Sequence, residues 1–187
     1  MELDGIVEFL RVVSQLKKVK RSGWISQVGV KDPESVADHS FMCTVLAMCV
    51  GDINGFDVQK IMRMALLHDI HESIIGDYDQ CAKEKIGSTQ MKVLERKAIT
   101  EVLSQLPTKL KADYLSLWEE FENQTTPETI IVKEIDKVEM ALQALEYENE
   151  GYSPQKLNTF WNSAKGKVQN PTLLRFLEVL VEARLKV

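Results

Sequence analysis

Apolar residues recur every three to four positions along most of this 187-residue chain, the spacing that places them on one face of a helix. No stretch shows the strict alternation of apolar and polar residues that is typical of a half-buried strand. The sequence contains no internal repeat, no long low-complexity segment and no linker that would divide it. These patterns predict an all-α fold in which residues 1–187 form a single domain, a helical bundle with short connections.

The overall composition limits the class of partner. Hydrophobic residues make up 44% of the chain and charged residues 27%, as in ordinary soluble proteins. The formal net charge of -5 provides no basic field, so we expect no binding to a nucleic-acid polymer, although a small phosphate substrate needs only local cations. Three cysteines without a CxxC pair fit a reducing compartment. The acidic N-terminus, and the absence of an uninterrupted apolar run of about 18 residues, lead us to expect a cytoplasmic protein without a membrane partner.

Local signals indicate several helix starts and connections. Ser35 is the expected N-cap of one helix, with Asp38 as its acidic capping partner. Residues 83–88 are polar and predict a mobile connection. The closing helix, near residues 171–185, carries an apolar stripe that either covers the core or forms the contact of an expected homodimer: Leu173, Phe176, Leu177, Leu180 and Val181.

One predicted helix ends in side chains that bind metals. Ile61, Met64 and His68 recur at helical spacing, so His68 extends the buried stripe. Asp69 follows directly, and Glu72 lies one turn beyond both. Burying a carboxylate beside an imidazole is costly unless a cation or a dense hydrogen-bond network compensates it, and a divalent metal ion does so directly. The alternative is a polar helix end with a capping Asp and a hydrogen-bonded core His.

Two more polar residues lie on apolar stripes elsewhere in the chain. His39 falls on the core-facing side of its predicted helix, where a hydrogen-bonded core histidine is the alternative interpretation. Asp136 has apolar neighbours four positions before and after it, and the alternative there is pairing with Lys133 or Lys137. Imidazole and carboxylate ligands together suit Mn, Fe, Co, Ni or Zn better than Ca.

Two turns carry further candidate groups. Residues 21–24 predict a non-helical turn in which Arg21 offers a guanidinium to phosphate and Trp24 offers a stacking surface, although Trp24 serves equally well as a core anchor. After the His68 helix, a glycine turn leads to Asp77, which is either a turn former or a carboxylate aimed back at His68. His71 is a further possible ligand, because it follows His68 by three positions.

The order of a histidine, a His-Asp pair and a late aspartate resembles the HD-domain superfamily of metal-dependent phosphohydrolases. Over residues 7–184 the chain is similar to the 5′-deoxynucleotidase branch, in the segments 21–24, 34–40, 65–72, 76–77 and 134–137. Two residues separate Arg21 from Trp24, as in the eukaryotic members of the branch, whereas the bacterial enzyme has the two side by side.

The resemblance implies an HD-type helical bundle and a role for each candidate residue. The implied ligands of one divalent metal ion are His39, His68, Asp69 and Asp136. Arg21 would hold the phosphate and Trp24 would border the sugar. Glu72 and Asp77 would lie beside the ion, where they organise water and substrate or hold a second ion. His71 stands where the relatives have a small residue, so its role is open.

The implied reaction is hydrolysis of a (deoxy)nucleoside 5′-monophosphate to nucleoside and phosphate. The ion, one of Co, Mn, Mg, Ni, Fe or Zn, would lower the pKa of a bound water toward ~7 and so supply the nucleophile. Either Glu72 or Asp77 would transfer the proton, while Arg21 acts on the phosphate. The same ligands serve hydrolases of dNTPs, cyclic nucleotides and guanosine tetraphosphate. Outside enzymes, the alternative is a non-catalytic metal-bound signalling module.

Overall fold

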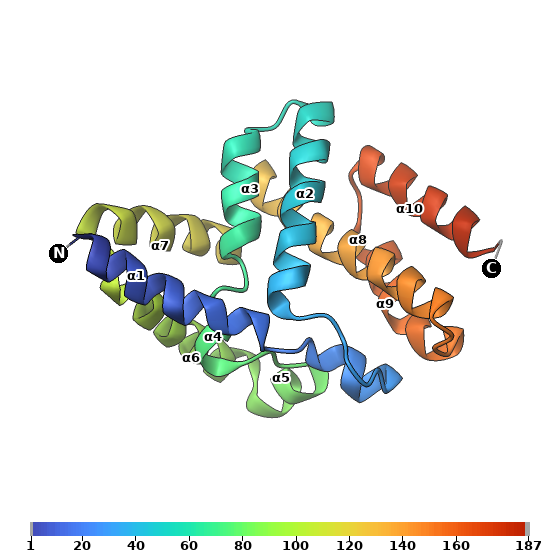
Figure 1. Ribbon diagram of the computed structural model, residues 1–187. Coiled ribbons are helices and arrows are strands. Elements are labelled where there is room, and N and C mark those ends of the chain that lie inside the picture. The colour runs from blue at the N-terminus through green and yellow to red at the C-terminus, as the bar shows by residue number, and fades with distance from the viewer. Residues whose placement is uncertain (1, 186–187) are drawn as a thin grey trace. The chain divides into compact units, whose positions relative to one another are not determined.

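The computed structural model describes residues 2–185, and its regular elements are helices (Figure 1). An isolated antiparallel bridge joins Lys20 to Ser35. The all-α prediction is therefore confirmed. The α-helices are α1 Glu2–Val13, α2 Val36–Asn54, α3 Val58–Leu67, α4 Glu72–Ile75, α5 Gln80–Ile86, α6 Ser88–Val102, α7 Thr108–Asn123, α8 Pro127–Asn149, α9 Pro154–Lys167 and α10 Pro171–Arg184. Shorter turns form the 3₁₀ helices η1 Ser14–Lys17 and η3 Leu103–Gln105 and the π-helix η2 Trp24–Val28.

The chain divides into two compact units, so the single domain expected over residues 1–187 stays a prediction. The first unit comprises Met1–Phe41 with Leu66–Asn123, and the second comprises Met42–Ala65 with Gln124–Val187. The core of the first unit is formed by ten buried side chains: Phe9, Leu16, Val36, Leu67, Ile70, Ile99, Val102, Leu103, Leu106 and Trp118. Helix α4 packs against α6 and η1, which supports the turn between α3 and α4.

In the second unit, α9 and α10 pack against the long helix α8 (Figure 1). The carboxylate of Glu134 on α8 accepts hydrogen bonds from the backbone N–H groups of Gln169 and Asn170, at 3.0 and 2.8 Å, and so anchors the start of α10. Three members of the predicted C-terminal stripe are buried in the protein: Leu173, Leu177 and Leu180. For these three the core interpretation is right and the dimer contact is wrong, because their apolar surface is already covered.

Several local predictions have a clear outcome. Ser35 and Asp38 form the expected capping pair, because the hydroxyl of Ser35 accepts from the N–H of Asp38 while the carboxylate of Asp38 accepts from Ser35.

The mobile connection expected over residues 83–88 is wrong, since helix α5 occupies much of it. Asp79 caps α5 by accepting from the N–H of Ala82 at 2.7 Å. The turn expected at residues 21–24 is wound into a helical turn that leads into η2.

Helix α2 is long and apolar enough, by length and composition, to cross a membrane, and 39% of its most apolar 18-residue stretch is buried in the protein. The core helix of a soluble protein meets the same criterion. Helix α2 also contains His39, which is completely buried. The expected absence of a membrane partner stays a prediction.

Candidate metal centre

The chain bends sharply where the His-Asp pair occurs. Helix α3 ends at Leu67, and the next residues continue through short-range backbone bonds: Ile70 donates to Leu67 at 3.2 Å and Glu72 donates to Asp69 at 3.0 Å. Neighbouring residues on a regular α-helix do not face each other. The tighter turn after α3 instead allows the side chains of His68 and Asp69 to meet.

Three of the four predicted metal ligands lie in one buried cluster. The Nε2 atom of His68 is 3.0 Å from Oδ2 of Asp69, and Nε2 of His39 is 3.9 Å from the same oxygen. The two imidazole rings meet edge to face, with centroids 5.4 Å apart. His39 is 0% exposed and His68 4%. Helix α2 and the turn after α3 therefore bring two imidazole nitrogens to one carboxylate oxygen.

The electrostatics of this cluster favour an ionised Asp69. Burial by itself would raise the pKa of Asp69, but the charge and hydrogen bond of His68 and the charge of Arg21 hold that pKa well below its ordinary value. A carboxylate that stays ionised while its side chain is only 17% exposed is suited to bind a cation. Two imidazoles and a carboxylate also form a donor set that suits divalent transition metals, so the residues present fit such an ion.

Arg21 and Asp77 join the cluster from its edge. The Nη1 atom of Arg21 lies 3.3 Å from Oδ2 of Asp69 and 3.3 Å from Oδ1 of Asp77. The other oxygen of Asp77 accepts hydrogen bonds from the backbone N–H and the hydroxyl of Ser22, the latter at 2.7 Å. Gly76 makes the turn before Asp77 with φ 80°, a conformation that favours glycine. Arg21 therefore links the carboxylate of Asp77 to that of Asp69, while the catalytic role of Asp77 stays a prediction.

Glu72 and His71 are buried beside the pair. Burial raises the pKa of Glu72 well above its ordinary value, and the charges of Asp69 and Asp77 raise it further. Within the described residues, Oε2 of Glu72 has no hydrogen-bond partner. Burial lowers the pKa of His71 to about 4, and its ring lies against Trp118 of α7 with centroids 5.8 Å apart. Glu72 therefore offers a buried, uncommitted oxygen, while His71 packs on the core.

Trp24 and Asp136 both make contacts that the alternative interpretations foresaw. Trp24 is 1% exposed and its indole N–H donates to Glu34 at 2.9 Å, so the ring has almost no free surface and its contact with a sugar stays a prediction. Asp136 belongs to α8 in the second unit, where Nζ of Lys137 lies 2.8 Å from its Oδ2. This ion pair is the alternative foreseen for Asp136, and the convergence of Asp136 on the histidines stays a prediction.

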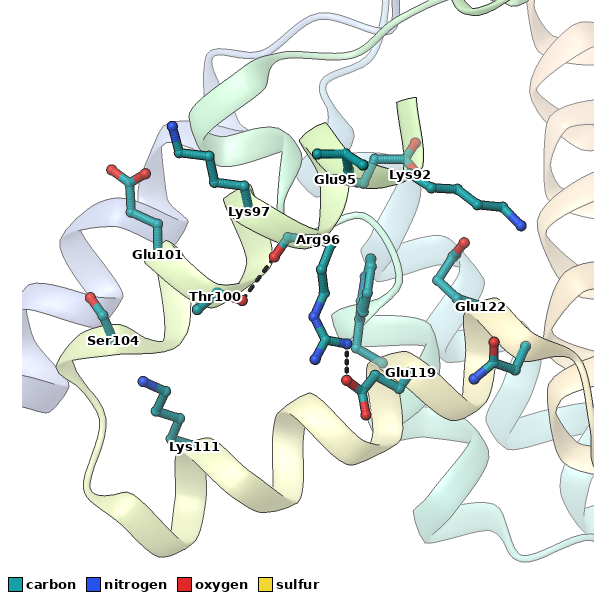
Figure 2. A pocket seen from close by; sticks show the side chains of 13 residues that line it. Lys92, Glu95, Arg96, Lys97, Thr100, Glu101, Ser104, Lys111, Glu119 and Glu122 are labelled. Carbon is teal, nitrogen blue, oxygen red and sulfur yellow. Dashed lines mark hydrogen bonds and ion pairs between the residues drawn. The ribbon is translucent and has the colours of Figure 1, made fainter. Parts of the chain in front are cut away.

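A large groove lies in the first unit between α6 and α7 (Figure 2). Its volume is about 970 Å³, and its rim is lined by charged side chains such as Arg96 and Glu119, which form an ion pair. Trp118 lines the groove, and its ring also lies against the ring of His71. None of the predicted site residues lines the groove. We therefore place the candidate site at the buried cluster, where the metal-binding groups are.

Two residues near the site were missed from the sequence. Ser22 holds the carboxylate of Asp77, and a hydroxyl next to Arg21 was the available signal. Lys83 was assigned to a mobile connection, but it lies on α5. The charges of Asp69, Glu72 and Asp77 raise the pKa of its ammonium. The capping signal of Asp79, three positions before Ala82, would have predicted that helix.

Comparisons with known proteins identify the family of the chain. The family model described as "HD domain" matches residues 13–173. The 5′-deoxynucleotidase HDDC2 of Xenopus laevis is 41% identical over 184 residues, which cover 96% of this chain and 88% of that protein. The human 5′-deoxynucleotidase HDDC2 is 36% identical over 180 residues, which cover 96% and 86%.

Solved structures show the same fold. A Pyrococcus horikoshii protein superposes with a TM-score of 0.78 at 29% identity, and the match covers 95% of this chain and 97% of that one. A conserved hypothetical protein from Pyrococcus furiosus gives 0.76 at 30% identity, covering 97% and 99%. From the family match, the identities and the shared fold together, this chain belongs to the HD domain family.

Proposed function

We propose that this protein is a metal-dependent phosphomonoester hydrolase that converts (deoxy)nucleoside 5′-monophosphates to nucleoside and phosphate. The observation that carries the proposal is the buried convergence of His39 and His68 on Asp69, with Arg21 bridging Asp69 to Asp77. The substrate class is supported by relatives over almost the whole chain that are named 5′-deoxynucleotidase.

The protein's own residues would divide the work as follows. His39, His68 and Asp69 would hold the ion, and Asp136 would complete the ligand set. When bound, a divalent ion supplies a Lewis acid that activates water and neutralises phosphoryl charge. Arg21 binds a phosphate oxygen, because two carboxylates already hold its guanidinium in place.

The hydrogen bonds favour Glu72 over Asp77 as the group that transfers the proton. Both oxygens of Asp77 are engaged, one by Ser22 and the other by Arg21. Oε2 of Glu72 is buried and has no hydrogen-bond partner in the described part of the chain, so it is available to the reacting groups. We therefore assign proton transfer to Glu72 and the orientation of Arg21 to Asp77.

The experiment is a substrate panel with the purified protein loaded with Co, Mn or Mg. We expect phosphate release from dAMP, dGMP or dTMP, no release after chelation, and recovery when the metal is restored. Matched ribonucleotides measure the sugar preference. Cleavage restricted to dNTPs, cyclic nucleotides or guanosine tetraphosphate would replace the proposed substrate class. A metal-bound protein that is inert toward every nucleotide would support the signalling module.

The finer properties are part of the same proposal. We propose that the native ion is one of Co, Mn, Mg, Ni, Fe or Zn, which metal analysis of protein purified without added metal will identify. A cytoplasmic location is supported by the exposed free thiols of Cys49 and Cys81. We also propose a homodimer, which the molar mass in solution tests. The expected absence of nucleic-acid and membrane partners stays a prediction.

A further inference from the structure

Ser22 holds one oxygen of the Asp77 carboxylate with two hydrogen bonds. Oδ2 of Asp77 accepts from the backbone N–H of Ser22 and from its hydroxyl, the latter at 2.7 Å. The other oxygen, Oδ1, lies 3.3 Å from Nη1 of Arg21. The side chain of Asp77 is only 7% exposed, so water is a poor substitute for a lost donor. Ser22 therefore determines how Asp77 presents its second oxygen to Arg21.

The backbone that carries Ser22 is itself anchored. The N–H of Arg21 donates to the carbonyl of Glu34 at 3.1 Å, next to the isolated bridge between Lys20 and Ser35. Directly after Arg21 the chain winds into the helical turn that leads into η2. The hydroxyl of Ser22 thus belongs to a segment held by backbone hydrogen bonds, and this segment lies within the first unit together with Asp77.

The guanidinium of Arg21 depends on its carboxylate partners for its orientation. Its Nη1 atom lies 3.3 Å from Oδ2 of Asp69 and 3.3 Å from Oδ1 of Asp77. A long side chain with many rotamers binds phosphate well only when its orientation is fixed before the phosphate arrives. Asp77 is the partner that Ser22 orients, so the two serine hydrogen bonds extend to Arg21 through one carboxylate.

We propose that Ser22 is a positioning residue of the phosphate-binding site, whose hydroxyl orients Asp77 so that Asp77 holds Arg21 ready for a phosphate monoester and for free inorganic phosphate. This inference rests on the proposed function for its substrate. A hydroxyl has a single proton to donate, and Ser22 donates it to Asp77. Ser22 therefore acts through Asp77 and not on the phosphate itself.

The test compares Ser22→Ala and Ser22→Thr with Ser26→Ala. Ser26 lies one helical turn beyond Ser22 and its hydroxyl bonds to Asp79 instead, so it is a matched control. Inorganic phosphate is titrated into each metal-loaded protein by calorimetry, and metal content and thermal unfolding are measured in parallel. We expect the dissociation constant of phosphate to rise about three- to tenfold in Ser22→Ala, because the backbone N–H still holds Asp77. Ser22→Thr restores the hydroxyl and should recover most of the affinity, while Ser26→Ala should match the wild type.

A double-mutant cycle tests whether Ser22 acts through Asp77. In the Asp77→Ala background, adding Ser22→Ala should change phosphate affinity by less than about twofold, because the hydroxyl has lost the group that it orients. In the otherwise wild-type protein, Ser22→Ala should raise the KM for a nucleoside monophosphate by the same factor as the dissociation constant of phosphate, with a smaller change in kcat and unchanged metal content.

Three results would overturn the role of Ser22. They are equal phosphate affinity in Ser22→Ala and Ser26→Ala, effects of Ser22→Ala and Asp77→Ala that simply add, and a loss confined to metal content or thermal stability. Failure of the proposed function is distinguishable from these. A wild-type protein that binds phosphate but hydrolyses no nucleotide would refute the proposed function, yet the phosphate titrations would still decide the role of Ser22. A wild-type protein that binds no phosphate would overturn the positioning role itself.

Discussion

The Nε2 atom of His68 lies 3.0 Å from Oδ2 of Asp69, its immediate neighbour in the sequence. Adjacent residues on an uninterrupted α-helix point in different directions, so this contact depends on the end of α3 at Leu67. The same carboxylate oxygen also faces His39 and Arg21. One oxygen atom thus connects the proposed metal ligands to the proposed phosphate-binding group.

Replacement of Asp136 tests whether the fourth ligand reaches the metal centre. We expect Asp136→Ala to abolish both metal uptake and turnover, because the four-ligand set would lose one of its two carboxylates. Metal content of the purified protein is the primary measurement. Glu146→Ala, at an exposed position of the same helix, is the control and should retain the metal. Full metal content in Asp136→Ala would remove Asp136 from the site.

Replacement of Arg21 separates phosphate binding from metal binding. Arg21→Ala should raise KM and lower kcat, for a combined loss of about 10- to 100-fold in kcat/KM, the size of a charge-assisted hydrogen bond. Metal content should stay intact, because Arg21 contacts ligands and not the ion. Arg21→Lys should recover only part of the loss, since a lysine offers a compact point charge in place of the planar guanidinium whose Nη1 contacts both Asp69 and Asp77. A fall in metal content would show that the role assigned to Arg21 is wrong.

Replacement of Glu72 by its amide tests the proton-transfer assignment. Glu72→Gln keeps the size of the side chain but cannot exchange a proton, so kcat should fall by about 10²- to 10⁴-fold. The affinity for inorganic phosphate and the metal content should change little. Asp77→Asn is the comparison, and we expect it mainly to raise KM because it releases Arg21. If Asp77→Asn instead has the larger effect on kcat, the two assignments must be exchanged.

Gly76 permits the turn that aims Asp77 at the cluster. With φ 80° and ψ 170°, Gly76→Ala should cost about 1–3 kcal/mol of unfolding free energy, because an alanine side chain strains this backbone conformation. Denaturant unfolding measures the loss. Gly166→Ala lies within α9 with open space around it, so it should be neutral or stabilising by up to about 1 kcal/mol. Equal stability of the two variants would contradict this account of the turn.

The cap of α5 should respond to pH. Hydrogen bonds from Ser26 and from the N–H of Ala82 hold the pKa of Asp79 below its ordinary value of 3.8. The ionised cap therefore stabilises α5 above pH 3.8, and this contribution is lost as the pH falls through the lower pKa of the folded protein. Hydrogen exchange of the backbone amides within Gln80–Ile86 should become faster as the pH falls through that range. The increase should be smaller in Asp79→Asn, because asparagine keeps a hydrogen-bond acceptor that does not titrate.

Much of the local structure followed from the sequence. The Ser35–Asp38 cap and the all-α class were both predicted from neighbouring residues. The helix α5 was missed because its cap at Asp79 was not recognised and its residues are polar. The structure buries the indole of Trp24 and pairs it with Glu34, as the core-anchor alternative foresaw, while the contact of Trp24 with a sugar stays a prediction.

The sequence by itself determined the all-α class and which histidines and carboxylates are candidate metal ligands, because helical spacing assigns each residue to a buried or exposed face. Only the tertiary structure decided that His39 meets His68 at Asp69 and that Arg21 bridges two carboxylates. The physical reason is that periodicity reports on neighbours within a turn or two, whereas a contact between residues 21, 39 and 69 depends on how whole helices end and pack.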